Sequence, residues 1–167
     1  MPVDTSCTPI RVESSGFCLS ASRVGHGDHG LLVCLPLAEE RKGCQRPLYE
    51  LARRCDRSRM STLSFDYVGT GDSPGDFKDI SYQALVDNIF AMAKELMRTC
   101  SRLSLLGVRI GARIALDTIT QHPLDVESFI LWEPVLDPCE WVRNAQRRSR
   151  FRRGLPPSQI GDIDGFY

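Results

Sequence analysis

Two glycines four residues apart, Gly107 and Gly111, frame an arginine in a segment that could position a reactive side chain. The apolar residues 103–106 predict a strand before them, and a helical pattern follows. A strand that turns sharply through glycines into a helix holds the central side chain in the open, where a serine would act as a nucleophile. We call residues 107–111 the elbow. Its central residue is Arg109, which stays protonated and can be neither nucleophile nor general base, but whose planar guanidinium suits a carboxylate or phosphate.

Acidic residues that follow other predicted strands bear on the role of Arg109. The carboxyl ends of parallel strands meet at one edge of a sheet, so Glu39, Asp72 and Glu133 are close enough by topology to pair with it. Two interpretations stay open: Arg109 anchors an anionic ligand in a crevice, or an acid neutralises it in a closed pocket. The ligand-binding candidates are Arg109, Glu39, Asp72, Ser73, Trp132 and Glu133.

Structural roles, rather than ligand binding, can also explain several of these residues. Glu39 and Glu40 precede a predicted helix, and the favoured interpretation is that they complement the positive end of that helix or are simply solvated. Trp132 ends a predicted strand, where it could line a pocket, although a core aromatic is the favoured interpretation. Ser73 and Cys34 are poor substitute nucleophiles, because no base is in sight for either.

The histidines are badly placed to serve as a base at the elbow. His26 and His29 precede the first core strand, and His122 stands at a predicted helix end. His26 and His29 flank Asp28 in a glycine-rich turn, which is better explained as solvated than as a metal site. The seven cysteines are scattered without a C-x-x-C pair, which favours reduced thiols acting as small hydrophobic side chains. We expect no metal and no cofactor.

Alternating strand and helix patterns run along the chain. The predicted strands are 8–12, 16–21, 31–35, 60–67, 103–106 and 126–132. The predicted helices are 46–57 with Pro47 in its first turn, one capped by Ser81 and ending near Met97, one from the elbow to about Gln121, and one that Asp137, Pro138 and Glu140 begin. This order predicts an α/β fold, a mostly parallel sheet with helices on both faces.

Several blocks resemble a known family. The segment 69–75, GTGDSPG, resembles the loop after strand four of serine aminopeptidase-like α/β-hydrolases. More narrowly, 35–40 (LPLAEE), 71–77 (GDSPGDF), 107–112 (GVRIGA) and 131–136 (LWEPVL) resemble the exosortase A system-associated hydrolases, in the group called hydrolase 2. The resemblance spans roughly residues 30–140 and implies the α/β-hydrolase fold.

The resemblance also implies roles for individual positions. Arg109 takes the nucleophile position, and the narrower family likewise carries arginine there. The backbone amides of Leu37 and Ile110 stand where oxyanion donors would be. In competent hydrolases the loop after the first core strand begins His-Gly, whereas here it begins Leu35-Pro36, which weakens the oxyanion assignment.

Length and composition favour one domain over residues 1–167, because 42% of the residues are hydrophobic and charged residues are 25%. The formal net charge of +0 argues against general nucleic-acid binding. No apolar run is long enough for a transmembrane segment, and the amino-terminus shows no signal pattern, so we expect a cytoplasmic protein. The hydrolase fold takes its acid and histidine from later strands, so we expect a C-terminally truncated domain that retains the N-terminal part.

These observations lead to a main hypothesis and an alternative. The main hypothesis is a non-hydrolytic pseudoenzyme whose crevice binds a small anionic, acyl or sugar-type ligand and which, by resemblance, serves an exopolysaccharide and exosortase locus. The alternative is an ester, thioester or peptide hydrolase whose remaining catalytic residues lie in a missing C-terminal part. An open sheet edge would favour self-association or a partner chain.

A cluster of arginines distinguishes the last predicted helix. Residues 138–153 contain six arginines and one glutamate, a net charge of +5 that leaves −5 on the rest of the chain. Such a cluster could contact anionic lipid or nucleic acid, whereas a solvated lid helix is the favoured interpretation.

Overall fold

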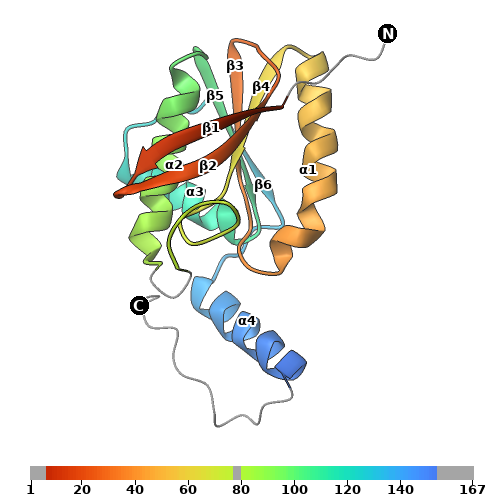
Figure 1. Ribbon diagram of the computed structural model, residues 1–167, viewed down its shortest axis with the longest axis vertical. Coiled ribbons are helices and arrows are strands. Elements are labelled where there is room, and N and C mark those ends of the chain that lie inside the picture. The colour runs from red at the N-terminus through yellow and green to blue at the C-terminus, as the bar shows by residue number, and fades with distance from the viewer. Residues whose placement is uncertain (1–6, 77–79, 154–167) are drawn as a thin grey trace.

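The computed structural model describes residues 7–76 and 80–153, which form a sheet flanked by helices (Figure 1). The sheet has six strands in the order β1-β2-β4-β3-β5-β6. The strands are β1 (Cys7–Ser14), β2 (Phe17–Val24), β3 (His29–Cys34), β4 (Met60–Phe65), β5 (Arg102–Val108) and β6 (Ser128–Trp132). The helices are α1 (Glu40–Arg57), α2 (Tyr82–Met97), α3 (Ile110–Gln121) and α4 (Pro138–Arg153).

The continuous apolar runs form the central strands, as predicted. β3 and β5 pair in parallel, β4 lies parallel to the other side of β3, and β6 lies parallel to β5. β1 and β2 instead form an antiparallel hairpin that joins the sheet through β4. Ser15 and Gly16 close the hairpin with φ angles of 51° and 80°, the left-handed conformation that tight hairpin turns need. The predicted α/β class with a mostly parallel sheet is confirmed.

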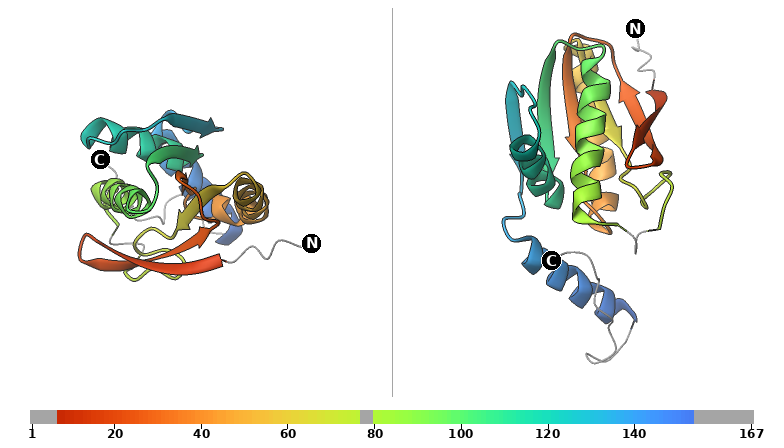
Figure 2. Two further views of the ribbon diagram at one scale, coloured as in Figure 1. Left: turned by 90° about the horizontal axis from the view of Figure 1, so that it is seen from above. Right: turned by 90° about the vertical axis from the view of Figure 1, so that its left-hand side faces the viewer.

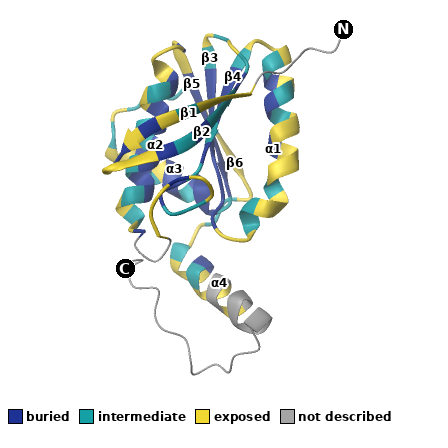
Figure 3. Cartoon of the chain, in the orientation of Figure 1, coloured by how far each residue is buried: buried dark blue, intermediate teal, exposed yellow. Residues whose placement is uncertain are grey.

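Helices cover both faces of the sheet, which is also as predicted (Figure 2). α1 packs on one face against β4 and β2, and α2 and α3 pack side by side on the other face. The buried residues lie on the central strands and on the sides of the helices that face them (Figure 3). Ser81 caps α2 as expected, because its hydroxyl accepts a 3.1 Å hydrogen bond from the amide of Ala84.

The start of α1 corrects the prediction. The helix begins at Glu40, six residues before the predicted start, and Pro47 lies inside it rather than in its first turn. Pro47 cannot donate to the carbonyl of Gly43, but both residues lie on the exposed side, where water can take that hydrogen bond. The first turns were missed because residues 40–46 carry almost no apolar side chains and include a glycine.

The last strand lies at an open edge of the sheet. β6 pairs with β5 alone among the strands of the described residues. Ile130 and Leu131 are about half exposed, and Trp132 is 39% exposed. The interpretation of Trp132 as a core aromatic is therefore wrong, because no described element covers the outer side of its strand. Among the described residues, no helix is long and apolar enough to cross a membrane.

Candidate active site

The elbow is built by close packing at its two glycines. A Cβ atom at Gly107 would lie 2.3 Å from the Cα of Ala112, and one at Gly111 would lie 2.3 Å from the carbonyl oxygen of Cys34. Neither position has room for a side chain, so the start of α3 presses directly on the end of β3. Arg109 between them has φ 56° and ψ −123°. Such a conformation is strained for a residue with a side chain, and it is the price of turning a strand straight into a helix.

Backbone hydrogen bonds fix Arg109 to the segment that follows β6. Its amide donates to the carbonyl of Trp132 at 3.0 Å, and its own carbonyl accepts from Val135 at 3.2 Å. The same carbonyl accepts from Ala112 at 3.1 Å, which starts α3. Backbone hydrogen bonds to the segment after β6 and to α3 thus hold Arg109 in its strained conformation. Such a conformation persists only where the surrounding structure holds it in this way.

The guanidinium of Arg109 pairs mainly with Glu40. Its Nη2 lies 3.3 Å from one carboxylate oxygen of Glu40, and its Nε lies 3.4 Å from the other. Its Nη1 faces Glu133, at 3.4 Å from the backbone carbonyl and 3.9 Å from the carboxylate. The Arg109 side chain is 34% exposed, so the ion pairs do not close it off from solvent.

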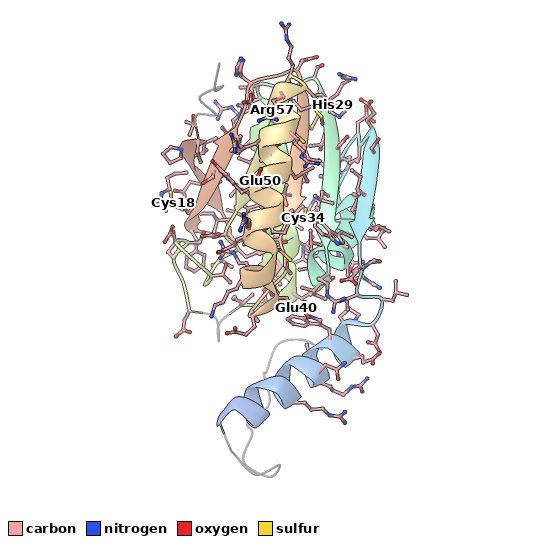
Figure 4. All side chains as sticks on the ribbon, turned by 90° about the vertical axis from the view of Figure 1, so that its right-hand side faces the viewer. Cys18, His29, Cys34, Glu40, Glu50 and Arg57 are labelled. Carbon is pink, nitrogen blue, oxygen red and sulfur yellow. The ribbon has the colours of Figure 1, made fainter. Side chains whose placement is uncertain are left out.

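Glu40 also holds α4 in place. The indole N–H of Trp141 donates to the Glu40 carboxylate at 3.1 Å, and Trp141 is buried. Figure 4 shows Glu40 at the end of α1 that faces α4. Asp137 begins α4 as predicted, because its side chain accepts from the amides of Cys139 and Glu140 at 2.9 and 3.1 Å.

An open pocket of about 490 Å³ lies between the elbow and α4. One wall is apolar and comes from the β6–α4 connection and from the indole of α4. The polar lining residues include two cations, Arg109 and Arg147, and two acids, Asp137 and Glu140. The lining residues are Arg109, Pro134, Val135, Leu136, Asp137, Glu140, Trp141, Asn144 and Arg147. A pocket of this size, with an apolar wall and several polar and charged groups, suits a small amphiphilic molecule.

The contacts recorded for Glu39 and Asp72 are with residues other than Arg109. Glu39 pairs with Lys42 at 3.3 Å, one helical turn away on the surface of α1. Asp72 is tied elsewhere, because its amide donates to Asp66 at 2.8 Å and its carbonyl accepts from Arg11 at 3.4 Å. Of the three acids named from the sequence, Glu133 is the one whose contact with Arg109 the structure records.

Ser73 and Trp132 also lie away from this pocket. Ser73 is buried, donates to the Asp66 carbonyl at 2.6 Å and accepts from the Ser20 amide at 2.9 Å. Its hydroxyl therefore fastens the loop after β4 onto β2. Trp132 takes part through its carbonyl, which anchors the elbow, and its ring is not part of the pocket wall.

The residues assigned to an oxyanion hole by resemblance lie at the same end of the sheet. Leu37 follows β3 and Ile110 is the first residue of α3, and both side chains are buried. The contact of Gly111 with the carbonyl of Leu35 brings their two segments together. An oxyanion role for either amide stays a prediction.

Among the described residues, Cys34, His29 and His122 do not form a catalytic triad or dyad with the elbow. Cys34 is fully buried, and burial raises the pKa of its thiol far above the ordinary value. His29 contacts the hydroxyl of Ser104 at 2.8 Å at the opposite end of β3, and His122 stacks on Phe90 at the far end of α3. Among residues 7–76 and 80–153, no group of histidine, cysteine and acidic side chains could hold a metal ion.

Three residues of the site were missed: Glu40 as the partner of Arg109, and Trp141 and Cys44 as neighbours of Glu40. Glu40 and Trp141 make the contacts given above, and Cys44 lies one helical turn after Glu40. The pKa of the Cys44 thiol is raised mainly by burial, then by Glu40, while Arg109 opposes the shift. The adjacent acids Glu39 and Glu40 were a sequence signal that could have identified Glu40. When two neighbouring residues begin a helix, their side chains point in different directions, so only one of them can face the elbow.

No family model matches the chain, and no curated protein matches it. Solved structures do match it. An esterase of Pyrococcus furiosus has a TM-score of 0.70 at 15% identity, over 92% of this chain and 57% of that one. An esterase of Exiguobacterium antarcticum has a TM-score of 0.64 at 18% identity, over 77% of this chain and 46% of that one. The N-formylmaleamic acid deformylase of Pseudomonas putida S16 has a TM-score of 0.63 at 21% identity, over 88% of this chain and 57% of that one.

The chain thus spans about half the length of these structures, between 46% and 57%. Their folds match this chain over 77% to 92% of its length, while the identities of 15% to 21% are too low to carry activity or substrate from one protein to another. The six-stranded, mostly parallel sheet of this chain, with its elbow between β5 and α3, is an α/β-hydrolase fold.

Proposed function

We propose that this chain is a non-hydrolytic protein of the α/β-hydrolase fold whose pocket binds a small acyl or sugar-type ligand through a carboxylate or phosphate group. The observation that carries the proposal is Arg109, which holds φ 56° and ψ −123° at the elbow. Strained backbone of this kind persists at functional sites, and here it presents a permanent cation where a hydrolase would present a nucleophile.

The contacts of Arg109 leave one side of the guanidinium for a ligand. Glu40 engages Nε and Nη2 and so fixes the plane of the group. The 3.9 Å contact from Nη1 to the carboxylate of Glu133 is long, and the Glu133 side chain is 74% exposed. A ligand carboxylate can displace this solvated contact at little cost, because exposed ion pairs contribute about 0–1 kcal/mol.

The rest of the pocket supports an amphiphilic ligand. Val135, Leu136 and Trp141 offer an apolar wall, while Asn144 and Arg147 offer polar contacts on α4. An acyl chain or sugar ring can lie on the apolar wall while its charged group meets Arg109. The sequence blocks that resemble exosortase A system-associated hydrolase 2 support a role beside exopolysaccharide synthesis, with a ligand drawn from that chemistry.

Calorimetry with octanoate, octyl phosphate and glucuronate as probes tests the proposal, with octanol as the uncharged control. We expect at least one charged probe to bind more tightly than octanol. Arg109→Ala should weaken that binding by about 1.5–3 kcal/mol, the value of a hydrogen bond to a charged group. Arg113→Ala is the matched control, because Arg113 lies one turn later on α3 and pairs with Asp117. Equal affinities in the Arg109 variant and the parent protein would reject the proposal.

A further inference from the structure

We infer that α4, together with the exposed leucine at its base, docks on an anionic lipid surface. The first observation is the distribution of charge. Residues 138–153 carry six arginines and one glutamate, while the remainder of a chain with zero formal charge carries −5. A helix with four to eight arginines or lysines attracts anionic lipids, because each cation gains free energy near the headgroups.

The second observation is the position of α4. The helix leaves the end of β6 and projects away from the sheet and its covering helices (Figures 1 and 2). Among the described elements it packs against α3, and its hydrogen bond from Trp141 to Glu40 attaches its first turn to α1. The helix therefore lies outside the body of the protein, within reach of an external partner.

The third observation is the arrangement of the cations along the helix. Positions 143, 147 and 150 are spaced i, i+4 and i+7, so they share one face of α4. Arg143 is 65% exposed on its side chain, and the acid recorded near it is Asp137 at 3.7 Å. Like charges at this spacing repel each other and destabilise an isolated helix. An external anionic surface would relieve that repulsion.

The apolar residues beside α4 favour a bilayer over a nucleic acid. Leu136, which immediately precedes the helix N-cap, is 81% exposed. Leu131 and Trp132, which end β6, are 50% and 39% exposed. Amphiphilic surfaces that join cations to leucine and tryptophan lie in the headgroup region, where the apolar side chains enter the boundary of the acyl chains. A nucleic-acid phosphate backbone offers nothing comparable to an exposed leucine.

Co-sedimentation with lipid vesicles tests the inference on the full chain. We expect the protein to pellet with vesicles of phosphatidylcholine and phosphatidylserine and to stay in the supernatant with vesicles of phosphatidylcholine alone. Added salt should weaken the binding, because screening shortens the reach of the surface potential. Equal partition onto both kinds of vesicle, or onto neither, overturns the inference.

Paired variants separate the docking surface from general charge. The double variant Arg143→Gln with Arg150→Gln removes two cations of α4, and Arg143 is not among the described residues that line the pocket at the elbow. We expect it to lower the vesicle partition coefficient by about 25-fold, or about fivefold for each arginine. The matched control, Arg54→Gln with Arg57→Gln, removes the same charge from the last turn of α1 and should leave the partition unchanged. An equal loss in both double variants overturns the inference.

The apolar contribution has its own comparison. Leu136→Ser should lower vesicle binding, whereas Tyr49→Ser, at a half-exposed position on α1, should not. Circular dichroism spectra that match the parent protein show that each variant is folded. If the protein does not bind vesicles but binds duplex DNA or RNA, and the Arg143 and Arg150 substitutions weaken that binding, the partner is nucleic acid and the inference is wrong.

Discussion

Trp141 on α4 donates its indole N–H to the carboxylate of Glu40 on α1 at 3.1 Å, across 101 residues of sequence. The same carboxylate receives Nε and Nη2 of Arg109 from the elbow. One acidic side chain therefore joins the first crossover helix, the elbow and the last helix. Because Glu40 is only 16% exposed on its side chain, its charge depends on these donors, and removing any of them leaves a poorly solvated carboxylate.

The attachment of α4 should fail when this hydrogen bond is removed. Trp141→Phe keeps an aromatic ring in the buried position and loses the N–H donor. We expect the amides of α4 to exchange with deuterium about 10- to 150-fold faster, which corresponds to a hydrogen bond to a charged group. Trp132→Phe is the matched control, because the ring of Trp132 is 39% exposed. Unchanged exchange in α4 after the Trp141 substitution would show that the bond does not hold the helix.

The chain should show no serine-hydrolase activity. Arg109 is the central residue of the elbow, and the contacts of His29 and His122 place both at other parts of the fold. We expect no labelling by a fluorophosphonate probe and no turnover of p-nitrophenyl esters. Arg109→Ser should remain inactive as well, since no recorded contact of residues 7–76 and 80–153 brings a histidine to the elbow to activate the new hydroxyl. Stoichiometric labelling of a serine whose substitution also abolishes ester turnover would contradict this prediction.

The sequence was sufficient for the sheet and insufficient for the contacts of its site. The runs 31–35 and 103–106 predict β3 and β5 because strands buried on both faces must be apolar throughout. The sharp turn of the elbow could also be predicted from Gly107 and Gly111, because only glycine fits where α3 packs against the end of β3. The central strands and the elbow depend on residues that are close together in the sequence, so the sequence alone could predict them.

The partners of Arg109 depend instead on distant packing. Glu39 and Glu40 are the same residue type, and the choice between them rests on where α1 begins. Trp132 was assigned to the core for a similar reason, and Trp141 was not singled out. Trp132 looks like a core residue in an apolar strand but lies at an open edge, while Trp141 sits in an arginine-rich helix and is buried. Neither outcome is contained in the residue's immediate neighbours.

Cys18 offers a test of local electrostatics away from the site. The thiol is exposed on β2 opposite Glu13, and a hydrogen bond to Glu13 raises its pKa, with smaller contributions from desolvation and the Glu13 charge, while Arg11 opposes the shift. A raised pKa leaves less thiolate at neutral pH, so alkylation of Cys18 should rise only at higher pH. Glu13→Gln should move the rate profile to lower pH, and Arg11→Gln should move it to higher pH. Iodoacetamide labelling followed by peptide mass spectrometry measures both shifts. Shifts in the same direction would refute this assignment.

The two edges of the sheet should behave differently in solution. β1 at one edge carries Pro9, Arg11 and Glu13, and such residues discourage pairing with another chain. β6 at the other edge carries no charge and no proline, and its apolar residues Ile130 and Leu131 are half exposed. An edge of this kind is a template for a second strand. We therefore expect the isolated chain to self-associate through β6.

Sedimentation velocity measures this association. Ile130→Lys places a charge on the β6 edge and should return the chain to a monomer, because burying an unpaired cation in a strand interface is strongly unfavourable. Thr8→Lys, the same addition on β1, should leave the association unchanged, since that edge already bears charges. Both positions are exposed, so neither substitution should disturb the core. A parent chain that sediments as a monomer over a range of concentrations would show that the β6 edge does not mediate self-association. Association that persists in Ile130→Lys but disappears in Thr8→Lys would instead assign the contact to the hairpin of β1 and β2.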